Sequence, residues 1–431
     1  MRCYSKSDFG LTRPLMKIAL IMHELLVEGG GERQCVSLAR ELLRMGHDVD
    51  LYTSAYDREH CFPEVCRELK ITDIGRGIFP WLSKPRVLRA YLDMLRLGKS
   101  VSQHYEVWNP HHWPAEWGAL RLKNKLGGAV VWMCNDVPNF HEKMRDANSG
   151  TMSRLIYKLD YLYDRAQAQK IDLIVFLSWW AENEFKAIYT ARTRVIRSGS
   201  DPQRFRPGGN RKKIRTRFGY SDEDFVVLWL GIVMPHRRLQ DAIFAINHLK
   251  RKGNNVRLLV AGSGEGFPEY FESLQKLSRE LNLESEVAFA GKVPDDEMRD
   301  FYCACDAFLF PNENQTWGLA VLEAMACGCP VLVSRGAAVH EVLTDGKDAL
   351  LFPARNPEAL AAKIHMLMAD PEQRARIADA GMQLVRTRFN WERFAEQMAA
   401  VFDQVIKGRL PDEVAGADIE NSPTGYSRQS S

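Results

Sequence analysis

The segment PNENQTWGLAVLEAMACGCPV, residues 311–331, joins a polar loop to an apolar helix and could bind an anion. A predicted strand, AFLFP, ends where this segment begins, and we expect the helix to begin near Trp317. The free backbone N–H groups of Trp317, Gly318 and Leu319 would then point out of the helix start, which favours an anion such as phosphate. Gly318 would also let a ligand approach the backbone closely.

Glu323 is the one carboxylate of this apolar helix, where its neighbours are Val, Leu, Ala and Met. It lies in the second turn, beyond easy reach of the favourable field at the helix start. A shielded carboxylate needs hydrogen-bond donors, and the diol of a ribose offers two hydroxyl groups. Glu323 could instead cap a neighbouring backbone segment or pair with an arginine. The pattern alone leaves both interpretations open.

Two adjacent arginines, Arg237 and Arg238, follow the predicted strand FVVLWLG. If that strand belongs to a parallel sheet, the arginines lie at its carboxyl edge, where ligands of such sheets bind. Two guanidinium groups there could hold a diphosphate through charge-assisted hydrogen bonds. Adjacent arginines are otherwise common on a solvated surface. The predicted anion-binding helix start near Trp317 favours the diphosphate interpretation.

Strands and helices alternate along the chain in a way that predicts parallel sheets. The strand KIALIM is followed by the loop Gly29-Gly30-Gly31, a helix over residues 32–45 and the strand VDLYTS, which together form a β-loop-α-β unit. The glycine loop is either an approach loop for phosphate or a flexible turn, because it lacks the GxGxxG spacing. The alternation resumes after VIRSGSDPQRFRPGGNRKK, a basic stretch rich in Gly and Pro that we interpret as a linker.

We therefore predict an α/β protein with two tandem, Rossmann-like, doubly wound domains. The N-terminal domain is expected over residues 16–198 and the C-terminal domain over residues 199–388. A helix over residues 389–408 is expected to return to the N-terminal domain. The polar residues 409–431 are expected to form a disordered tail.

The composition limits the partners and the cellular location. The chain has 431 residues, with 58 basic and 55 acidic side chains and a net charge of +3, so a nucleic-acid partner is not expected. Its nine cysteines include the pairs Cys303/Cys305 and Cys327/Cys329, whose spacing does not suit zinc. We expect reduced core thiols in a cytoplasmic protein, and no metal site. No run reaches the ~18 apolar residues of a membrane span.

Five stretches of the sequence resemble the GT-B fold glycosyltransferases of family 4, a group of retaining enzymes. The resemblance spans roughly residues 16–405 and is strongest in QTWGLAVLEAMACGCPVLVS, followed by HEVLTDGKDALLFPARNPEALA. Other matching stretches are GGGERQCVSLARELLRMGHDV, VIRSGSDPQRFRP and GKVPDDEMRDFYCACDAFLFP. The resemblance implies a GT-B fold in which two Rossmann-like domains face each other across a cleft. The second domain would bind a nucleotide-sugar donor and the first domain the acceptor.

The resemblance also assigns roles to particular residues. Glu323 matches the second acidic residue of the family's E-x7-E motif, which binds the ribose. Arg237 matches a lysine that binds the diphosphate, and Arg238 lies beside it. Val293 matches a position whose backbone touches the nucleobase. Gly318 and Leu319, which follow Trp317 at the predicted helix start, match backbone amides near the donor phosphates. Gly30 and Gly31 match a loop that approaches the sugar phosphate.

Three positions depart from the family's pattern. Gln315 replaces the first glutamate of E-x7-E, so it can bond a sugar hydroxyl but cannot act as a nucleophile. Ile232 replaces the arginine of the family's G-R-x4-K motif, which leaves Arg237 and its neighbour to hold the diphosphate. Asn135, followed by Asp136, replaces a histidine often found after the fourth strand of the first domain. The expected catalytic residues are Arg237, Gln315 and Asn135.

The resemblance implies a retaining, metal-independent hexosyltransferase of polysaccharide or glycolipid biosynthesis. Such an enzyme is expected to need no cofactor and to use a nucleotide diphosphate sugar as its co-substrate. The stretch DREHCFPE is similar to mannosyltransferases that extend dolichol-linked oligosaccharides, which favours GDP-mannose over a UDP-sugar. The expected acceptor is a glycan or a polyprenyl-linked glycan. Two alternatives are a GT-B fold sugar-nucleotide epimerase and a non-catalytic subunit that binds a nucleotide sugar.

A basic amphipathic segment raises the question of membrane contact. Residues 79–100, FPWLSKPRVLRAYLDMLRLGKS, have five basic side chains and one acidic side chain, with Trp, Tyr and Leu between them. The segment could dock peripherally on an anionic membrane, on its cytoplasmic face. The alternative is an ordinary core-packed helix with a basic outer face.

Overall fold

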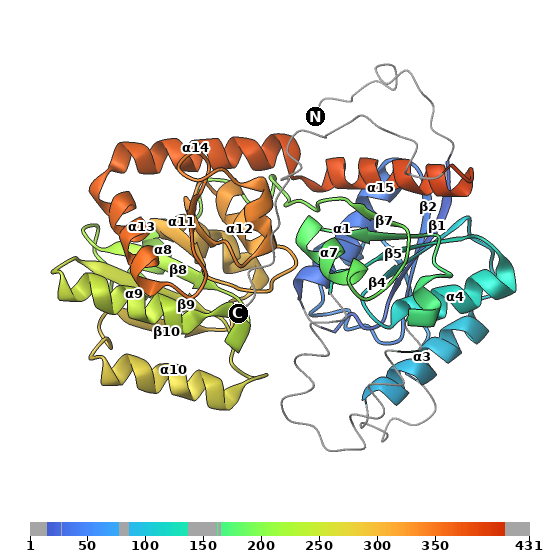
Figure 1. Ribbon diagram of the computed structural model, residues 1–431, viewed down its shortest axis with the longest axis horizontal. Helices are drawn as coiled ribbons and strands as arrows, with labels where there is room; N and C mark the ends of the chain where they lie inside the picture. The colour runs from blue at the N-terminus through green and yellow to red at the C-terminus, as the bar shows by residue number, and fades with distance from the viewer. Residues whose placement is uncertain (1–14, 27, 77–85, 137–161, 163–164, 410–431) are drawn as a thin grey trace.

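The computed structural model describes all of the chain except residues 1–14, 27, 77–85, 137–161, 163–164 and 410–431. It has two lobes, each built on one parallel sheet with helices on both faces (Figure 1). The predicted α/β class with two tandem doubly wound domains is therefore confirmed. The expected tail lies almost entirely outside the described residues, and so does the first part of the basic amphipathic segment.

The N-terminal lobe has a seven-stranded parallel sheet in the order β3-β2-β1-β4-β5-β6-β7. At its centre β1 pairs with both β2 and β4, so that Leu20 lies opposite Leu51 and Asn109. The inner strands are buried along most of their length, as in parallel sheets covered on both faces. The strands are β1 Lys17–Met22, β2 Asp48–Thr53, β3 Lys70–Asp73, β4 Val107–His111, β5 Ala129–Met133, β6 Leu173–Phe176 and β7 Thr193–Val195.

The C-terminal lobe has a six-stranded parallel sheet in the order β10-β9-β8-β11-β12-β13. Its central strand β8 pairs with β9 and β11, with Leu228 opposite Leu259 and Phe308. Both sheets thus reverse their strand order once beside the first strand, between β1 and β4 and between β8 and β11. The strands are β8 Phe225–Leu230, β9 Val256–Ala261, β10 Val287–Gly291, β11 Ala307–Phe310, β12 Val331–Ser334 and β13 Leu350–Phe352.

Helices cover the sheets with apolar faces, and several begin at a side-chain cap. Ser178 accepts a hydrogen bond from the Ala181 N–H at 3.2 Å, and Asn390 accepts one from the Arg393 N–H at 2.9 Å. In the part of the chain that the structure describes, the α-helices are α1 Gly30–Arg44, α2 Pro63–Cys66, α3 Arg86–Ser100, α4 Ala115–Leu126, α7 Trp179–Lys186, α8 Arg211–Arg217, α9 Leu239–Arg251, α10 Pro268–Glu280, α11 Met298–Ala304, α12 Leu319–Ala326, α13 Pro357–Ala369, α14 Pro371–Arg388 and α15 Trp391–Ile406. Short 3-10 helices are η1 Pro235–Arg237, η2 Asp295–Glu297 and η3 Ala338–Val342.

Among the described residues, three hydrophobic clusters form the core. One packs within the N-terminal lobe around Trp108 and Phe176, and a second packs within the C-terminal lobe around Trp229 and Phe352. The third cluster runs through both lobes, because it contains buried residues of α1 and α15 as well as of α11 and α12. The lobes therefore share apolar contacts in addition to the covalent chain.

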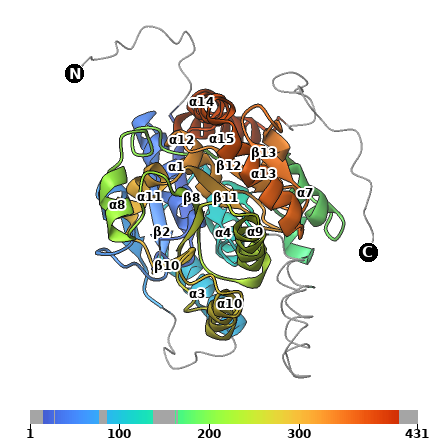
Figure 2. The same ribbon diagram turned by 90° about the vertical axis from the view of Figure 1, so that its left-hand side faces the viewer.

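The chain crosses between the lobes twice, and the two crossings touch. The Ser200 N–H donates to the Phe389 carbonyl at 2.9 Å. A Cβ atom on Gly199 would lie 2.4 Å from the backbone nitrogen of Asn390, so a side chain does not fit at this crossing. After the second crossing α15 packs against α1 of the N-terminal lobe, while α14 packs against α12 of the C-terminal lobe (Figures 1 and 2).

Short edge strands are the main difference from the predicted elements. The strands β3, β7 and β13 have only three or four residues, and β3 and β7 are partly exposed. They carry too little apolar alternation to stand out in the sequence. The helix expected near Trp317 begins at Leu319, and the predicted linker ends in the first turn of α8.

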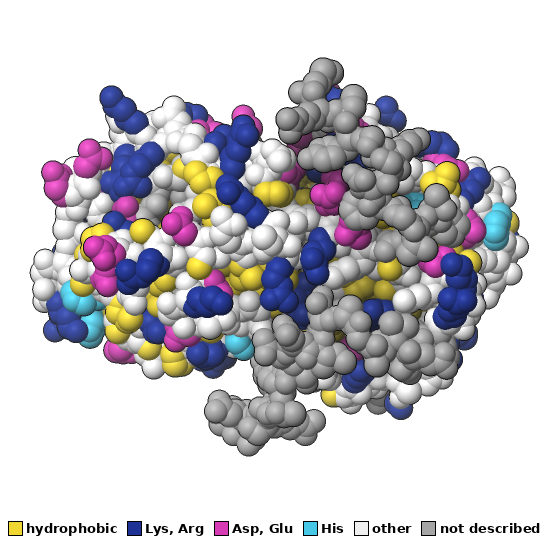
Figure 3. Space-filling view, turned by 90° about the horizontal axis from the view of Figure 1, so that it is seen from above, with side chains coloured by type: hydrophobic (Ala, Val, Ile, Leu, Met, Phe, Trp, Pro, Cys, Tyr) yellow, Lys and Arg dark blue, Asp and Glu magenta, His cyan; other side chains and the backbone are white. Residues whose placement is uncertain are grey.

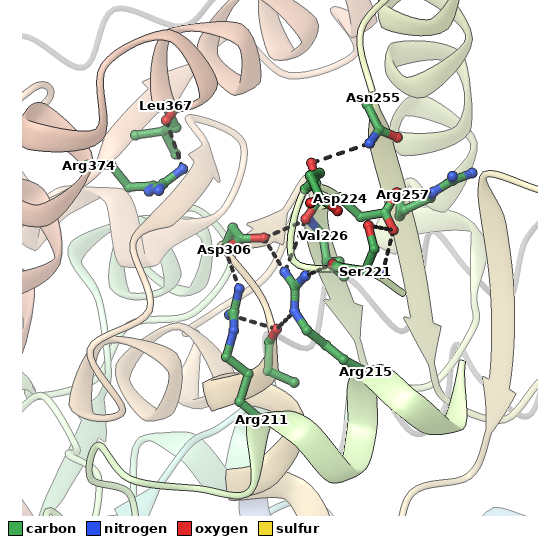
Figure 4. Close-up of polar contacts among 12 residues, drawn as sticks. Arg211, Arg215, Ser221, Asp224, Val226, Asn255, Arg257, Asp306, Leu367 and Arg374 are labelled. Atoms are coloured by element: carbon green, nitrogen blue, oxygen red, sulfur yellow. Dashed lines mark hydrogen bonds and ion pairs between the residues drawn. The ribbon is translucent and has the colours of Figure 1, made fainter. Parts of the chain in front are cut away.

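A partly buried ion network fixes α8 to the C-terminal sheet (Figure 4). Arg215 donates to the Asp306 carboxylate at 2.6 Å and to the Ala304 carbonyl at 3.1 Å. Asp306 also accepts the Val226 N–H at 2.8 Å and pairs with Arg211 at 3.0 Å. Because each charge has partners, the network holds the first helix after the crossing against β8 and β11.

The described surface is mixed in charge. Seen from above, Lys and Arg side chains are interspersed with Asp and Glu over both lobes (Figure 3). Among the described residues, no helix has the length and apolar character that a bilayer crossing requires.

Candidate functional site

A cavity of about 450 Å³ lies between the lobes, beyond the carboxyl ends of β1, β4, β8 and β11. These strands flank the point where each sheet reverses its order, which is where doubly wound domains bind ligands. Both lobes line the cavity. The N-terminal lobe contributes Gly30, Gly31, Glu32, Arg33, Gln34, His112, Asn135, Asp136, Leu177 and Ser198, and the C-terminal lobe contributes Ile232, Arg237, Asn312, Gln315, Trp317, Gly318, Leu319 and Glu323.

Arg237 brings a positive charge to the cavity from the C-terminal lobe. It lies at the end of η1, and its Nε atom is buried with no hydrogen-bond partner among the residues that the structure describes. Burial lowers the pKa of Arg237 to about 10, so the guanidinium stays charged at neutral pH. A partly buried cation that forms no ion pair is stabilised by a bound anion.

The start of α12 lines the same cavity. The first hydrogen bonds into this helix run from the N–H groups of Val321 and Leu322 to the Gly318 carbonyl, at 3.0 and 3.3 Å. The N–H groups of Gly318, Leu319 and Ala320 precede them and are the donors left over at a helix start. A Cβ atom on Gly30, in the opposite lobe, would lie 3.5 Å from the Leu319 side chain. The helix start and the glycine loop thus face each other across a narrow gap.

Glu323 also lines the cavity and is 4% exposed. Its carboxylate accepts a hydrogen bond from the Tyr302 hydroxyl at 2.9 Å, and the Arg33 Nε atom lies 3.7 Å away. Desolvation raises the pKa of Glu323, and the charge of Arg33 offsets this only in part. The structure therefore shows the arginine pairing that was one of the two interpretations of Glu323, with Arg33 as its partner. The 3.7 Å separation is too long for a hydrogen bond, so the carboxylate keeps capacity for another donor.

Arg33 connects the two lobes beside this carboxylate. It projects from α1 and forms an ion pair with Asp295, which precedes α11 in the C-terminal lobe. Arg204 donates to the Asp295 carbonyl at 2.7 Å. A second hollow of about 890 Å³ opens next to the cavity, and the two share Glu28 and Arg33. Arg33 therefore lines both, whereas its partner Asp295 lines the second hollow.

His112 occupies the space beside the glycine loop. A Cβ atom on Gly31 would lie 1.6 Å from the His112 Nε2 atom, so this close approach requires glycine. The His112 Nδ1 atom is 3.1 Å from the Asp136 carboxylate. Burial opposes protonation of His112, but the hydrogen bond and charge of Asp136 outweigh it and raise the pKa. Glu32, also at the cavity, has a raised pKa because of burial, partly offset by His112.

Gln315 is held by its neighbours at the edge of the cavity. The Asn312 amide donates to its side-chain oxygen at 3.4 Å, and the Ala338 N–H donates to its carbonyl at 2.9 Å. Its side chain also contacts His236, whose pKa is lowered to about 4, first by burial and then by the charge of Arg237. Gln315 is therefore fixed in place beside His236, which precedes Arg237 in the chain.

Most of the residues singled out in the sequence lie together at this cavity. They are Gly30, Gly31, Asn135, Asp136, Ile232, Arg237, Gln315, Trp317, Gly318, Leu319 and Glu323.

Two residues singled out in the sequence do not line the cavity. Arg238 is turned to Asp241, with nitrogen–oxygen distances of 2.8 and 3.0 Å. Val293 packs against the core cluster that runs through both lobes, while its neighbours Lys292 and Pro294 line the second hollow.

Three further residues of the site were not expected from the sequence: Arg33, His112 and Tyr302. Arg33 and Tyr302 contact Glu323 only because separate elements pack together in the fold. A local sequence pattern does not predict such contacts. His112 had a signal, because the stretch VWNPHH ends a predicted strand with two histidines at the carboxyl edge. Its neighbour His111 is buried, and burial lowers the pKa of His111 to about 3.

Two family descriptions match the two lobes separately. Residues 28–204 match the family described as Glycosyltransferase Family 4, and residues 210–384 match the family described as Glycosyl transferases group 1. The chain is 25% identical over 408 residues to D-inositol 3-phosphate glycosyltransferase of Corynebacterium glutamicum (strain R), covering 89% of this chain and 94% of that protein. It is 25% identical over 407 residues to mannosylfructose-phosphate synthase of Agrobacterium fabrum, covering 87% and 86% respectively.

Solved structures share the arrangement of the two lobes. The Anabaena protein HepE, in complex with UDP and glucose, has a TM-score of 0.75 and 18% identity, with 90% of this chain and 100% of that chain covered. Sucrose-phosphate synthase of Thermosynechococcus elongatus has a TM-score of 0.75 and 19% identity, with 91% and 99% covered. At 18–19% identity these similarities show a shared fold alone.

Proposed function

The chain belongs to the GT-B fold glycosyltransferases of family 4 and group 1, and from this premise we propose that it transfers a hexose from a nucleotide diphosphate sugar to a hydroxyl group of an acceptor, with retention of configuration. The acceptor we favour is a glycan or a polyprenyl-linked glycan. The named relatives widen the range of acceptors to test, because two of them are named for products or acceptors that carry phosphate.

The position of Arg237 is the observation that carries this proposal. The partly buried guanidinium of Arg237, which forms no ion pair among the described residues, lies at the same cavity as the free amides of Gly318 and Leu319. These groups suit a diphosphate. Glu323 at the same cavity suits the ribose diol of a nucleotide. Together they support a site for the nucleoside diphosphate part of a donor.

The same groups support a mechanism. Transfer breaks the bond between the sugar C1 atom and the phosphate oxygen, and forms a bond between C1 and the acceptor oxygen. Negative charge develops on the departing β-phosphate, where Arg237 and the amides of Gly318 and Leu319 would stabilise it. The proton of the acceptor hydroxyl passes to a phosphate oxygen. Because Arg237 would stabilise the charge on the β-phosphate, it would also favour departure of the nucleoside diphosphate from the sugar.

We favour attack on the same face that the phosphate leaves, without a covalent intermediate. Gln315 is neutral and cannot displace the phosphate. The carboxylates that line the cavity are Glu28, Glu32, Asp136 and Glu323. Of these, Glu323 accepts a hydrogen bond from Tyr302 and Asp136 lies against His112. Mass spectrometry of the enzyme mixed with donor would decide the matter, since a glycosyl adduct on a carboxylate would overturn front-face attack.

The proposal includes activity without a metal ion, because a cation and amide groups are placed to balance the phosphate charge. One group of described side chains, His23, Glu24 and Asp93, has metal-ligand types within reach of one another. Arg89 forms ion pairs with both carboxylates of that group. We expect transfer to persist in EDTA, and a loss of activity that Mg²⁺ or Mn²⁺ restores would refute metal independence.

The identity of the hexose is proposed as mannose, from GDP-mannose. The stretch DREHCFPE and a relative named mannosylfructose-phosphate synthase support it. A structural neighbour is described in complex with UDP-glucose, so UDP-glucose is the competing donor. Thermal-shift titrations with GDP, UDP, ADP and dTDP, run beside Glu323→Ala, would identify the base. Stabilisation by one nucleotide, reduced in the variant, is the expected result.

Product analysis separates transfer from the two alternatives. An epimerase would convert the nucleotide sugar with no acceptor present. A non-catalytic subunit would bind the nucleotide and turn over no acceptor. Appearance of a new glycoside together with nucleoside diphosphate is the result that we expect.

Peripheral contact with an anionic membrane is part of the proposal. The inner side of α3 is buried at Ala90, Met94 and Leu97, whereas Arg96 and Lys99 are exposed. Such an outward basic side supports attraction to anionic lipid. Co-sedimentation with phosphatidylglycerol vesicles should exceed that with phosphatidylcholine vesicles and fall at high salt. Equal sedimentation with both would argue against the contact.

A further inference from the structure

Three neutral side chains on the N-terminal side of the cavity have polar atoms without protein partners. Both amide atoms of Gln34, both amide atoms of Asn135 and the hydroxyl of Ser198 are buried, with no hydrogen bond to any residue that the structure describes. The residues themselves are 1%, 6% and 0% exposed. All three line the cavity. Buried polar groups are normally hydrogen-bonded, so a cluster of three such side chains needs a physical explanation.

The three side chains come from neighbouring elements. Gln34 lies in the second turn of α1. Asn135 and Ser198 follow β5 and β7, and β6 lies between these strands in the sheet. The carboxyl ends of these parallel strands lie at one edge of the sheet, so Asn135 and Ser198 lie at that edge and, with Gln34, line one part of the cavity, which we call its floor. Leu177, which follows β6, completes it.

The chemistry of this floor suits hydroxyl groups. Each of the three side chains is uncharged and offers both a donor and an acceptor, as does a sugar hydroxyl. A phosphate would need an available cation, but on this lobe Arg33 is paired with Asp295 and His112 with Asp136, and the carboxylate of Glu32 also lines the cavity. The cation Arg237 lies on the other lobe.

We infer that Gln34, Asn135 and Ser198 form a neutral subsite on the N-terminal lobe that binds the hydroxyl groups of an uncharged sugar or polyol moiety. The inference rests on the proposed function, because that moiety belongs to one of the two substrates of the transfer. It is either the hexose of the donor or the acceptor. Both present the same hydroxyl chemistry, and the experiment below separates them.

The stability of the ligand-free protein gives the first test. Gln34→Leu keeps the size of the side chain and removes the unpartnered amide, so the melting temperature should stay the same or rise. A glutamine with a structural hydrogen bond would instead lower it. Gln404→Leu is the matched control, because Gln404 accepts a hydrogen bond from Arg194 at 3.1 Å and lies outside the cavity. Ser198→Ala provides a second variant of the subsite.

Ligand affinity gives the second test, by calorimetry with UDP, GDP, UDP-glucose and GDP-mannose and by saturation-transfer NMR with glucose, fructose and myo-inositol. Nucleotide affinity should be unchanged in Gln34→Leu and Ser198→Ala. Affinity for the nucleotide sugar should fall about tenfold if the subsite takes the donor hexose. If it takes the acceptor, affinity for the nucleotide sugar is unchanged and the polyol signal falls. Gln404→Leu should change none of these.

Two results would overturn the subsite. One is a lower melting temperature for both ligand-free variants, which would mean that Gln34 and Ser198 have structural partners. The other is unchanged affinity of both variants for nucleotide sugars and polyols. Failure of the proposed function would look different, because wild-type protein would then bind none of the nucleotides while the stability test still reports on the subsite.

Discussion

Replacing Arg237 by methionine should weaken nucleotide binding, whereas the same change at the adjacent Arg238 should not. Arg237 lines the cavity and forms no ion pair among the described residues. Arg238 is bound to Asp241 at 2.8 Å and does not line the cavity. The two substitutions remove the same charge from neighbouring positions, so each controls for the other.

The expected magnitudes follow from burial and partners. A hydrogen bond to a charged group is worth about 1.5–3 kcal/mol, so Arg237→Met should raise the Kd for the preferred nucleotide by roughly 10- to 150-fold. Burial holds the pKa of Arg237 down to about 10, which corresponds to a desolvation cost of roughly 3 kcal/mol at most. The ligand-free Arg237→Met protein should therefore be at least as stable as the wild type.

Arg238→Met should behave in the opposite way. Its partner Asp241 is 3% exposed and would lose its ion pair, which costs about 1–3 kcal/mol of stability. Nucleotide affinity should stay within about twofold. Calorimetric titration with UDP and GDP, together with urea denaturation of the free proteins, measures both quantities. Equal losses of affinity in the two variants, or an unchanged Kd in Arg237→Met, would refute the assignment of the diphosphate to Arg237.

Three further predictions concern the ribose site, the C-terminal lobe and the pH response. Glu323→Gln should raise the calorimetric Kd for UDP or GDP by about tenfold but leave that for the 2′,3′-dideoxy analogue unchanged, and equal effects on both would exclude a ribose contact. Arg215→Leu should lower the free energy of unfolding in urea by about 1.5–3 kcal/mol, because the partly buried Asp306 loses one charged partner and keeps Arg211 and the Val226 N–H, and a loss below about 1 kcal/mol would contradict that role of the network. The raised pKa of His112 means that its pair with Asp136 stabilises the fold fully below the unfolded histidine value near 6.5 and progressively less as pH rises through the folded value. The difference in melting temperature between wild type and Asp136→Asn should therefore shrink from pH 6 to pH 8, and a difference that grows would be evidence against the pair.

The sequence predicts the architecture well because the central strands are long and apolar. Strands such as β1 and β8 are buried on both faces, so their sequences are almost continuous runs of apolar residues that are easy to identify. The edge strands β3 and β7 are short and partly exposed, so their sequences resemble loops. Their pairing depends on a neighbouring strand that is already in place.

The site could be predicted only as far as it depends on local pattern. The glycine loop, the helix start and Glu323 each have such a pattern, and they meet at the cavity because of the strand order. Arg237 and Arg238 are the same residue type, so the sequence does not tell which of them faces the cavity. The backbone decides this, because Arg238 has a positive φ of 51° at the start of α9. The contact of Arg33 with Glu323 depends on how the two lobes meet, which no single segment encodes.

The touching crossings at Gly199 and Asn390 make the C-terminal lobe an insertion within the N-terminal lobe. On the ribosome, α1 is made early, but α15, which packs against it, is made only after the whole C-terminal lobe. The apolar residues of α15, from Trp391 to Phe402, therefore reach their partners last. A chain that stops before Trp391 leaves that side of α1 exposed and prone to aggregation. Completion of the N-terminal lobe is thus delayed until synthesis is nearly finished.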